Sequence, residues 1–206
     1  MRTSDSYCWG RPYRRAMQRP IVAVLAGGDS TRMGSDKAVI PFASSTMLES
    51  VLNSVSAIGD PIVIGRTKAP HGVLAIPDRR TDSRGPLTGL ETVLRREPDR
   101  TVVLVAVDHP FVQPRTLREM LALDGDAVIP LDTGWQQVTC AIYRPAFLKA
   151  ASETLDNGRR SIITALDLVT VNLVHDATWR SWGEDGRSWF SVDTPERLDE
   201  GLQRFG

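Results

Sequence analysis

The sequence predicts a single α/β domain with a doubly wound, mostly parallel sheet. Three observations support this fold class. Short apolar runs rich in β-branched residues, at 21–25, 61–65, 101–107 and 169–174, alternate with segments of helical periodicity. The run at 21–25 ends at two glycines and a polar loop, which is how a buried strand presents a ligand-binding loop. The length of 206 residues suits one domain that buries a full core.

Composition narrows the classes of partner and compartment. A formal net charge of zero argues against nucleic acid or a membrane surface, since such partners usually require a strongly basic face. The two cysteines, Cys8 and Cys140, lie far apart and form neither a metal motif nor a disulfide framework, which suits a reducing cytoplasm. No apolar stretch approaches the ~18 residues of a membrane span. We therefore expect a cytoplasmic protein.

The first residues differ from the rest of the chain. Residues 1–19 carry five arginines and almost no periodic apolar pattern, so we expect a solvated tail. A transit peptide or an anion-binding arm is the alternative. The domain itself is expected to span 20–206.

The loop after the first strand carries the strongest functional signal. Glycines at its start let backbone N–H groups approach an anion closely, and Arg32 and Lys37 add positive charge. The spacing fits neither a Walker A loop nor a G-x-G-x-x-G loop. The pattern therefore predicts a phosphate-binding loop of another kind.

Residues 25–38, Leu-Ala-Gly-Gly-Asp-Ser-Thr-Arg-Met-Gly-Ser-Asp-Lys-Ala, resemble the signature of nucleotidyltransferases with a Rossmann-like, glycosyltransferase-A-like fold. They are most similar to the molybdenum cofactor guanylyltransferases. Related cytidylyl- and uridylyltransferases usually carry Ala-Ala-Gly where this chain has Ala-Gly-Gly, and often Pro-Lys in place of Asp-Lys. The resemblance thus favours a guanine nucleotide. It implies that the nucleotide is bound in this segment by Leu25, Ala26, Gly27, Gly28 and Lys37.

Helical and strand patterns alternate after this loop. Thr46 and Glu49 have the spacing of a capping box, and apolar residues at helical spacing follow up to Ile58. Thr194 is expected to cap a terminal helix whose first position is Pro195. The other expected strands are 61–65, 72–76, 101–107, 126–130 and 169–174, and the other expected helices are 87–96, 114–121, 145–155, a short one after 159–161, and 197–205.

A polar segment follows the strand expected at 72–76. Ligand contacts concentrate in such loops at strand ends. The resemblance implies that an Asp here, Asp78, and a Gly-Pro-Leu-x-Gly turn beneath the base belong to the nucleotide site; the residues of that turn are Gly85, Pro86, Leu87 and Gly89. A capped turn before a helix is the alternative interpretation, and for Gly89 the two are evenly balanced.

The most apolar run, at 101–107, should be a central parallel strand, and it stops at Asp108. A carboxylate at this position lies in the crevice where open α/β sheets bind ligands, and it suits Mg²⁺. A strand-end cap is the alternative. The resemblance implies that Asp108 holds the metal, Mg²⁺ or alternatively Mn²⁺, and that Asp193 is a second carboxylate facing it. His109 is expected to be a bystander, because phosphate attacking phosphate needs no base.

The acceptor side is the least family-like part of the chain. The resemblance places it at 135–143, where Gln137 and Tyr143 keep the family pattern but Val138 replaces the usual proline. Arg159 and Arg160, at a helix start, match the geometry of an acceptor phosphate, although solvated surface arginines are nearly as good an explanation. The tryptophan-rich segment 179–189 is expected to serve packing.

The resemblance implies transfer of GMP from Mg-GTP to the terminal phosphate of a pterin acceptor, molybdopterin, with release of pyrophosphate. Arg32, Lys37 and Asp108 would be the catalytic residues, and no covalent nucleophile is needed. The alternatives are a cytidylyltransferase on the same pterin, a guanylyltransferase on another phosphorylated small molecule, and an adaptor that binds GTP without turnover. Proteins of cofactor biosynthesis or molybdoenzyme maturation are expected as transient partners.

Overall fold

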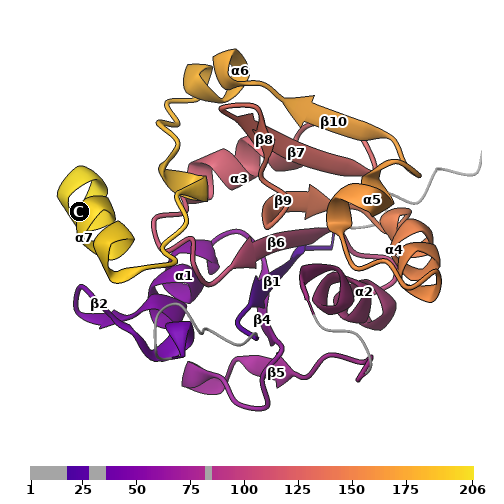
Figure 1. The fold of residues 1–206 in the computed structure, drawn as a ribbon, viewed down its shortest axis with the longest axis horizontal. Coiled ribbons are helices and arrows are strands. Elements are labelled where there is room, and N and C mark those ends of the chain that lie inside the picture. Colours follow the sequence, from indigo (N-terminus) through magenta and orange to yellow (C-terminus); the bar gives the residue numbers. More distant parts are fainter. Residues whose placement is uncertain (1–17, 28–35, 82–84) are drawn as a thin grey trace, which may run out of the picture.

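The fold was analysed in a computed structural model that describes residues 18–27, 36–81 and 85–206. Its centre is a twisted sheet with the strand order β10-β7-β9-β6-β1-β4-β5, and a short strand, β8, pairs with β7 (Figure 1). The strands in chain order are β1 (Ile21–Leu25), β4 (Asp60–Ile64), β5 (Leu74–Ile76), β6 (Val102–Ala106), β7 (Ala127–Asp132), β8 (Trp135–Gln136), β9 (Cys140–Tyr143) and β10 (Val171–Val174).

The pairing confirms a mostly parallel, doubly wound sheet. Strand β1 pairs in parallel with β4 and β6, β4 with β5, and β7 with β10. Strand β9 runs antiparallel between β6 and β7. The run at 101–107 is therefore a central strand as expected, but only its pairing with β1 is parallel.

Helices cover both faces of the sheet, and the alternation of side chains along each strand creates two cores. Val22 and Val24 point to one face, whereas Ile21 and Ala23 point to the other. Helices α1 (Met47–Val55), α3 (Pro114–Leu121), α6 (Asp176–Ser181) and α7 (Pro195–Phe205) pack on the first face. Helices α2 (Pro86–Arg96), α4 (Phe147–Asp156) and α5 (Ile162–Leu166) pack on the second face (Figure 1).

Several helix ends follow the local sequence signals. Thr46 and Glu49 form the predicted capping box, with the Glu49 amide donating to Thr46 Oγ1 at 3.3 Å and the Thr46 amide to Glu49 Oε2 at 2.9 Å. Thr194 accepts from the Arg197 amide at 3.3 Å, and Pro195 begins α7. The caps confirm the predicted starts of both helices.

Smaller elements complete the chain and show where the predicted bounds differ. Residues expected to begin a strand at 72 lie instead at the end of a 3₁₀ turn, so the strand before Asp78 is only three residues long.

Trp179 and Trp189 are buried and pack edge to face with their ring centroids 5.1 Å apart, which confirms their packing role. The remaining elements are β2 (Pro41–Phe42), β3 (Ser45–Thr46) and the 3₁₀ turns η1 (Lys37–Val39), η2 (Pro70–Gly72) and η3 (Arg187–Trp189).

Among the described residues, no helix is long and apolar enough to cross a bilayer. Gly28 and Arg32 of the glycine-rich loop, and most of the expected tail, lie outside the described residues.

Candidate active site

A cleft of about 610 Å³ opens at the carboxyl ends of the central strands β1, β4 and β6. Open α/β sheets bind ligands at this edge because consecutive loops diverge there. Residues that are far apart in the sequence, at or after the ends of β1, β4, β5 and β6, therefore line the same cleft. The described lining residues are Leu25, Ala26, Gly27, Asp36, Lys37, Ile64, Gly65, Asp78, Arg80, Thr81, Gly85, Pro86, Ala106, Val107, Asp108 and Thr139.

The floor of the cleft is made of backbone. A Cβ atom on Gly27 would lie 2.8 Å from Gly65 Cα, and one on Gly65 would lie 2.6 Å from Gly27 Cα. Gly65 also has φ of +84°, a conformation that side chains rarely adopt. The strand ends of β1 and β4 can therefore approach each other only because both residues lack side chains.

Lys37 and Asp108 form an ion pair in the cleft. Lys37 begins η1, whose N-cap Asp36 accepts a hydrogen bond from the Ala38 amide at 3.1 Å. Lys37 Nζ lies 3.3 Å from Asp108 Oδ2, and the two side chains are 17% and 24% exposed. Asp108 follows β6 directly. The structure thus brings together two of the three predicted catalytic residues, and the third, Arg32, lies outside the described residues.

Asp108 is held by the chain segment before α7. Its carbonyl accepts from the Val192 amide at 2.8 Å, and its Oδ2 accepts from Ser191 Oγ at 3.2 Å. Burial alone would raise the pKa of the carboxyl, but the positive charge of Lys37 and the hydrogen bonds from Lys37 and Ser191 bring it below its usual value. Asp108 is therefore ionised at neutral pH.

His109 is buried behind this carboxylate. Burial lowers the pKa of its imidazole, so the ring is neutral at pH 7. Its Nε2 lies 3.1 Å from Thr139 Oγ1 and 3.7 Å from Asp108 Oδ1. These contacts link β6 to the segment before β9, and the expectation that His109 is no base stays a prediction.

The donor set at Asp108 fits a hard cation. Asp108 Oδ1 is buried and has no hydrogen-bond partner among the described residues, so a carboxylate oxygen remains for a metal. Within those residues no group of three or more His, Cys, Asp or Glu side chains gathers as a metal site. Ser191 contacts Asp108 from the closing segment; Asp193 is half-buried two residues later, and its metal role stays a prediction.

Asp78, Gly85 and Pro86 line the far end of the cleft, in agreement with their predicted location. The side chain of Leu87 is fully buried in the second core, and the place of Leu87 in the nucleotide site stays a prediction. Its place in the first turn of α2 directs it into the sheet.

Gly89 lies inside α2, where the helix crosses the strand ends. A Cβ atom there would lie 2.7 Å from Leu25 Cδ2, 3.0 Å from Ile64 Cγ2 and 3.5 Å from Asp78 Oδ1. Gly89 therefore permits the close approach of helix and sheet, a packing role that neither interpretation predicted, and its place in the nucleotide site stays a prediction.

On the acceptor side, only Thr139 of the 135–143 segment lines the cleft among the described residues. Its carbonyl accepts from the Ala106 amide at 2.8 Å, which fixes the segment beside the end of β6. Gln137 is half-buried, and its Nε2 donates to the Trp135 carbonyl at 3.2 Å. The structure therefore supports the location of the segment and leaves the role of Gln137 a prediction.

Tyr143 belongs to the core. Its side chain is fully buried, its ring packs on Phe147 at 4.7 Å, and its hydroxyl donates to the Val138 carbonyl at 2.7 Å. Its side chain has no surface open to the cleft, and the acceptor role of Tyr143 stays a prediction. Tyr143 instead supports the backbone that leads to the cleft.

The structure does not bring Arg159 and Arg160 to the cleft lining. Both are exposed between α4 and α5, and Arg159 lines a separate hollow of about 430 Å³. Their role in acceptor binding stays a prediction, and the interpretation as surface arginines gains weight.

Sequence reasoning missed several residues of the cleft. Arg80 lines it and is anchored through Nη2 to Asp156 Oδ1 at 2.7 Å. Asp36 and Thr139 line it as well. Arg80 follows a predicted strand, so a search for polar residues at strand ends would have found it. Asp36 and Thr139 precede a turn and a strand that the sequence analysis did not predict.

The cleft therefore combines the backbone of Gly27 and Gly65 with the Lys37 ammonium group and the Asp108 carboxylate. Such an arrangement binds a phosphate chain and stabilises the charge that develops on it.

Comparisons with known proteins agree with this chemistry. A family model described as the MobA-like NTP transferase domain matches residues 22–171. A probable molybdenum cofactor guanylyltransferase from Natronomonas pharaonis is 32% identical over 198 residues, which cover 88% of this chain and 96% of that protein. One from Mycobacterium marinum is 33% identical over 156 residues, covering 70% and 77%.

Solved structures share the fold. Molybdopterin-guanine dinucleotide biosynthesis protein A from Archaeoglobus fulgidus superposes with a TM-score of 0.78 at 22% identity, covering 89% of this chain and 97% of that one. The 2-C-methyl-D-erythritol 4-phosphate cytidylyltransferase from Thermus thermophilus gives 0.65 at 17% identity, covering 91% and 98%. The family model and the relatives together show that this chain belongs to the MobA-like NTP transferase domain family and is a nucleotidyltransferase.

Proposed function

We propose that this protein transfers GMP from GTP to the terminal phosphate of a molybdopterin acceptor and releases pyrophosphate. The observation that carries the proposal is the Lys37–Asp108 pair at the carboxyl ends of the central strands, with one oxygen of Asp108 left without a hydrogen-bond partner among the described residues. The names of the relatives support a guanine nucleotide and a molybdenum cofactor substrate.

In this reaction a terminal phosphate oxygen of the acceptor attacks the α-phosphorus of GTP. The bond from the α-phosphorus to the bridging oxygen breaks, and that oxygen leaves with pyrophosphate. The attacking phosphate is already ionised at neutral pH, so no side chain must remove a proton.

The residues of this chain act by position and charge. Lys37, together with Arg32, stabilises the negative charge on the departing pyrophosphate. Asp108 holds the metal, and Mg²⁺ bound there would neutralise charge across the triphosphate. Thr139 and its neighbours border the space that remains for the acceptor.

The direct test measures pyrophosphate release from GTP by the purified protein, with Mg²⁺ and with or without molybdopterin. The proposal predicts release only when acceptor, metal and GTP are all present. Turnover with CTP in place of GTP would support a cytidylyltransferase on the same pterin. Binding of GTP without release would instead indicate an adaptor.

A further inference from the structure

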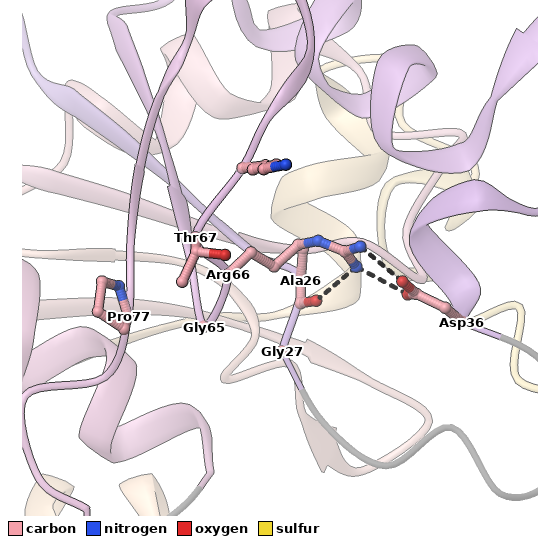
Figure 2. Close-up of a pocket in the computed structure, with 8 residues that line it drawn as sticks. Ala26, Gly27, Asp36, Gly65, Arg66, Thr67 and Pro77 are labelled. Carbon is pink, nitrogen blue, oxygen red and sulfur yellow. Dashed lines mark hydrogen bonds and ion pairs between the residues drawn. The ribbon is translucent and has the colours of Figure 1, made fainter.

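Arg66 joins the two ends of the glycine-rich segment to the end of strand β4. Its guanidinium forms a fork with Asp36, with Nη1 at 2.8 Å from Oδ1 and Nη2 at 2.6 Å from Oδ2. The same Nη1 donates to the Ala26 carbonyl at 3.3 Å. Figure 2 shows the side chain of Arg66 reaching between Ala26 and Asp36. A forked pair of this kind fixes both distance and orientation.

Asp36 also fixes the turn that carries Lys37. Asp36 Oδ1 accepts from the Ala38 amide at 3.1 Å and so caps the turn η1 that begins with Lys37. Lys37 Nζ in turn lies 3.3 Å from Asp108 Oδ2. Arg66, Asp36, Lys37 and Asp108 therefore form one continuous chain of contacts from β4 to the end of β6.

We propose that Arg66 is a positioning residue that acts through Asp36 to hold Lys37 in the cleft. The inference rests on the proposed function in one respect: it assumes that Lys37 contacts the nucleotide. Arg66 itself lines a hollow of about 450 Å³ beside the cleft. Asp36 lines both the hollow and the cleft, whereas Lys37 lines only the cleft.

The competing explanation is that Arg66 contacts the triphosphate directly and Asp36 only accompanies it. The two explanations differ in what removal of Asp36 does. If Arg66 positions Lys37, loss of either partner has the same effect, and losing both adds nothing. If Arg66 binds phosphate, removal of Asp36 frees its charge and strengthens nucleotide binding.

The first experiment needs no nucleotide. The chain contains three lysines, Lys37, Lys68 and Lys149, and acetylation by a brief pulse of an N-hydroxysuccinimide ester, read by mass spectrometry, reports the accessibility of each. We expect Arg66→Ala, Asp36→Ala and the double variant each to raise the Lys37 rate at least about threefold, with Lys149 as internal reference. An unchanged Lys37 rate in Arg66→Ala would overturn the proposal.

Two further variants separate positioning from general destabilisation. Arg66→Lys keeps the charge without the fork, so we expect an intermediate Lys37 rate. Arg100→Ala breaks an arginine–aspartate pair with Asp60 at the opposite end of β4. It should leave the Lys37 rate unchanged. A rise in Arg100→Ala equal to that in Arg66→Ala would contradict a specific role for Arg66.

The second experiment measures the dissociation constant of Mg-GTP by calorimetry for the same set. We expect about tenfold weaker binding in Arg66→Ala, Asp36→Ala and the double variant alike. Binding by Asp36→Ala as tight as wild type, with weaker binding by Arg66→Ala, would overturn the proposal. If wild type bound no nucleotide, the proposed function would fail, and the acetylation rates would still decide whether Arg66 positions Lys37.

Discussion

Lys37 and Asp108 reach the cleft from segments that lie 71 residues apart in the chain. Their pairing places a positive and a negative group, each partly buried, where the reaction requires charge of both signs. Asp108 stays ionised because Lys37 and Ser191 lower its pKa, so it can hold a cation at neutral pH. In the proposed reaction, this pair would meet a metal-bound phosphate chain with both charges already in place.

Replacement of Lys37 tests this arrangement at the level of one side chain. We expect Lys37→Ala to slow pyrophosphate release by about 100- to 1,000-fold, equivalent to roughly 3–4 kcal/mol, because one preorganised charge is lost. The matched control is Lys149→Ala, a lysine on α4 outside the cleft lining, which should keep wild-type activity. Activity of Lys37→Ala within tenfold of wild type would contradict the role of Lys37.

Single residues could be predicted where a short stretch of sequence around them carried the pattern. Lys37 and Asp108 stand in continuous motifs next to apolar runs, so both were predicted. The role of Arg66 was not, since its partner Asp36 is 30 residues away and no local pattern connects them. Leu87 and Tyr143 match the family pattern, but their burial follows from packing that a single motif does not reveal.

The ends of β1 and β4 are in close backbone contact at Gly27 and Gly65, and glycine substitutions test how much this contact matters for stability. Gly65 and Gly72 both have positive φ, but a Cβ atom on Gly72 would meet nothing within 4 Å. We expect Gly72→Ala to cost roughly 1–2 kcal/mol from conformation alone. Gly65→Ala should cost about 1–3 kcal/mol more, because the Gly27 backbone must move. Urea unfolding measures both, and equal losses would contradict the close approach of β1 and β4.

Helix α2 carries a buried carboxylate that ties the polar segment after β5 to the helix. Glu91 is fully buried and accepts from Arg79 Nη2 at 2.8 Å and from Arg95 Nε at 2.5 Å. Burial alone would raise the pKa of Glu91, but these hydrogen bonds bring it below the ordinary value of 4.5. Because the pKa of Glu91 is lower in the folded state than in the unfolded state, its ionised form stabilises the fold at pH values above 4.5. This contribution is lost as the pH falls through the folded-state pKa.

The consequence is a pH dependence that one substitution should reduce. We expect Glu91→Gln to lower the free energy of unfolding by roughly 1–3 kcal/mol at pH 7, since hydrogen bonds to a charged group are weakened. Between about pH 5 and pH 3 its stability should fall less steeply than that of wild type. Urea titrations across this range measure the effect. Parallel curves for the two proteins would show that the pKa of Glu91 does not differ between the folded and unfolded states.

For the whole molecule, the sequence predicted the alternation of strands and helices and the edge of the sheet that carries the site. It predicted neither strand β9 nor its antiparallel direction. A short, fully buried run such as Cys140–Tyr143 has the same apolar pattern in either direction. The direction depends on how the chain returns from β7 through β8, and that path is set by tertiary packing.

The central claim is that the cleft binds a guanine nucleotide together with a metal. The measurement that tests it most directly is the thermal stability of the protein with GTP, CTP, ATP or UTP, each with and without Mg²⁺. Ligand at ~100 times its dissociation constant should stabilise the fold by about 2.7 kcal/mol. We predict this shift with GTP and only in the presence of Mg²⁺. An equal shift without metal, or no shift with any of the four nucleotides, would contradict the claim.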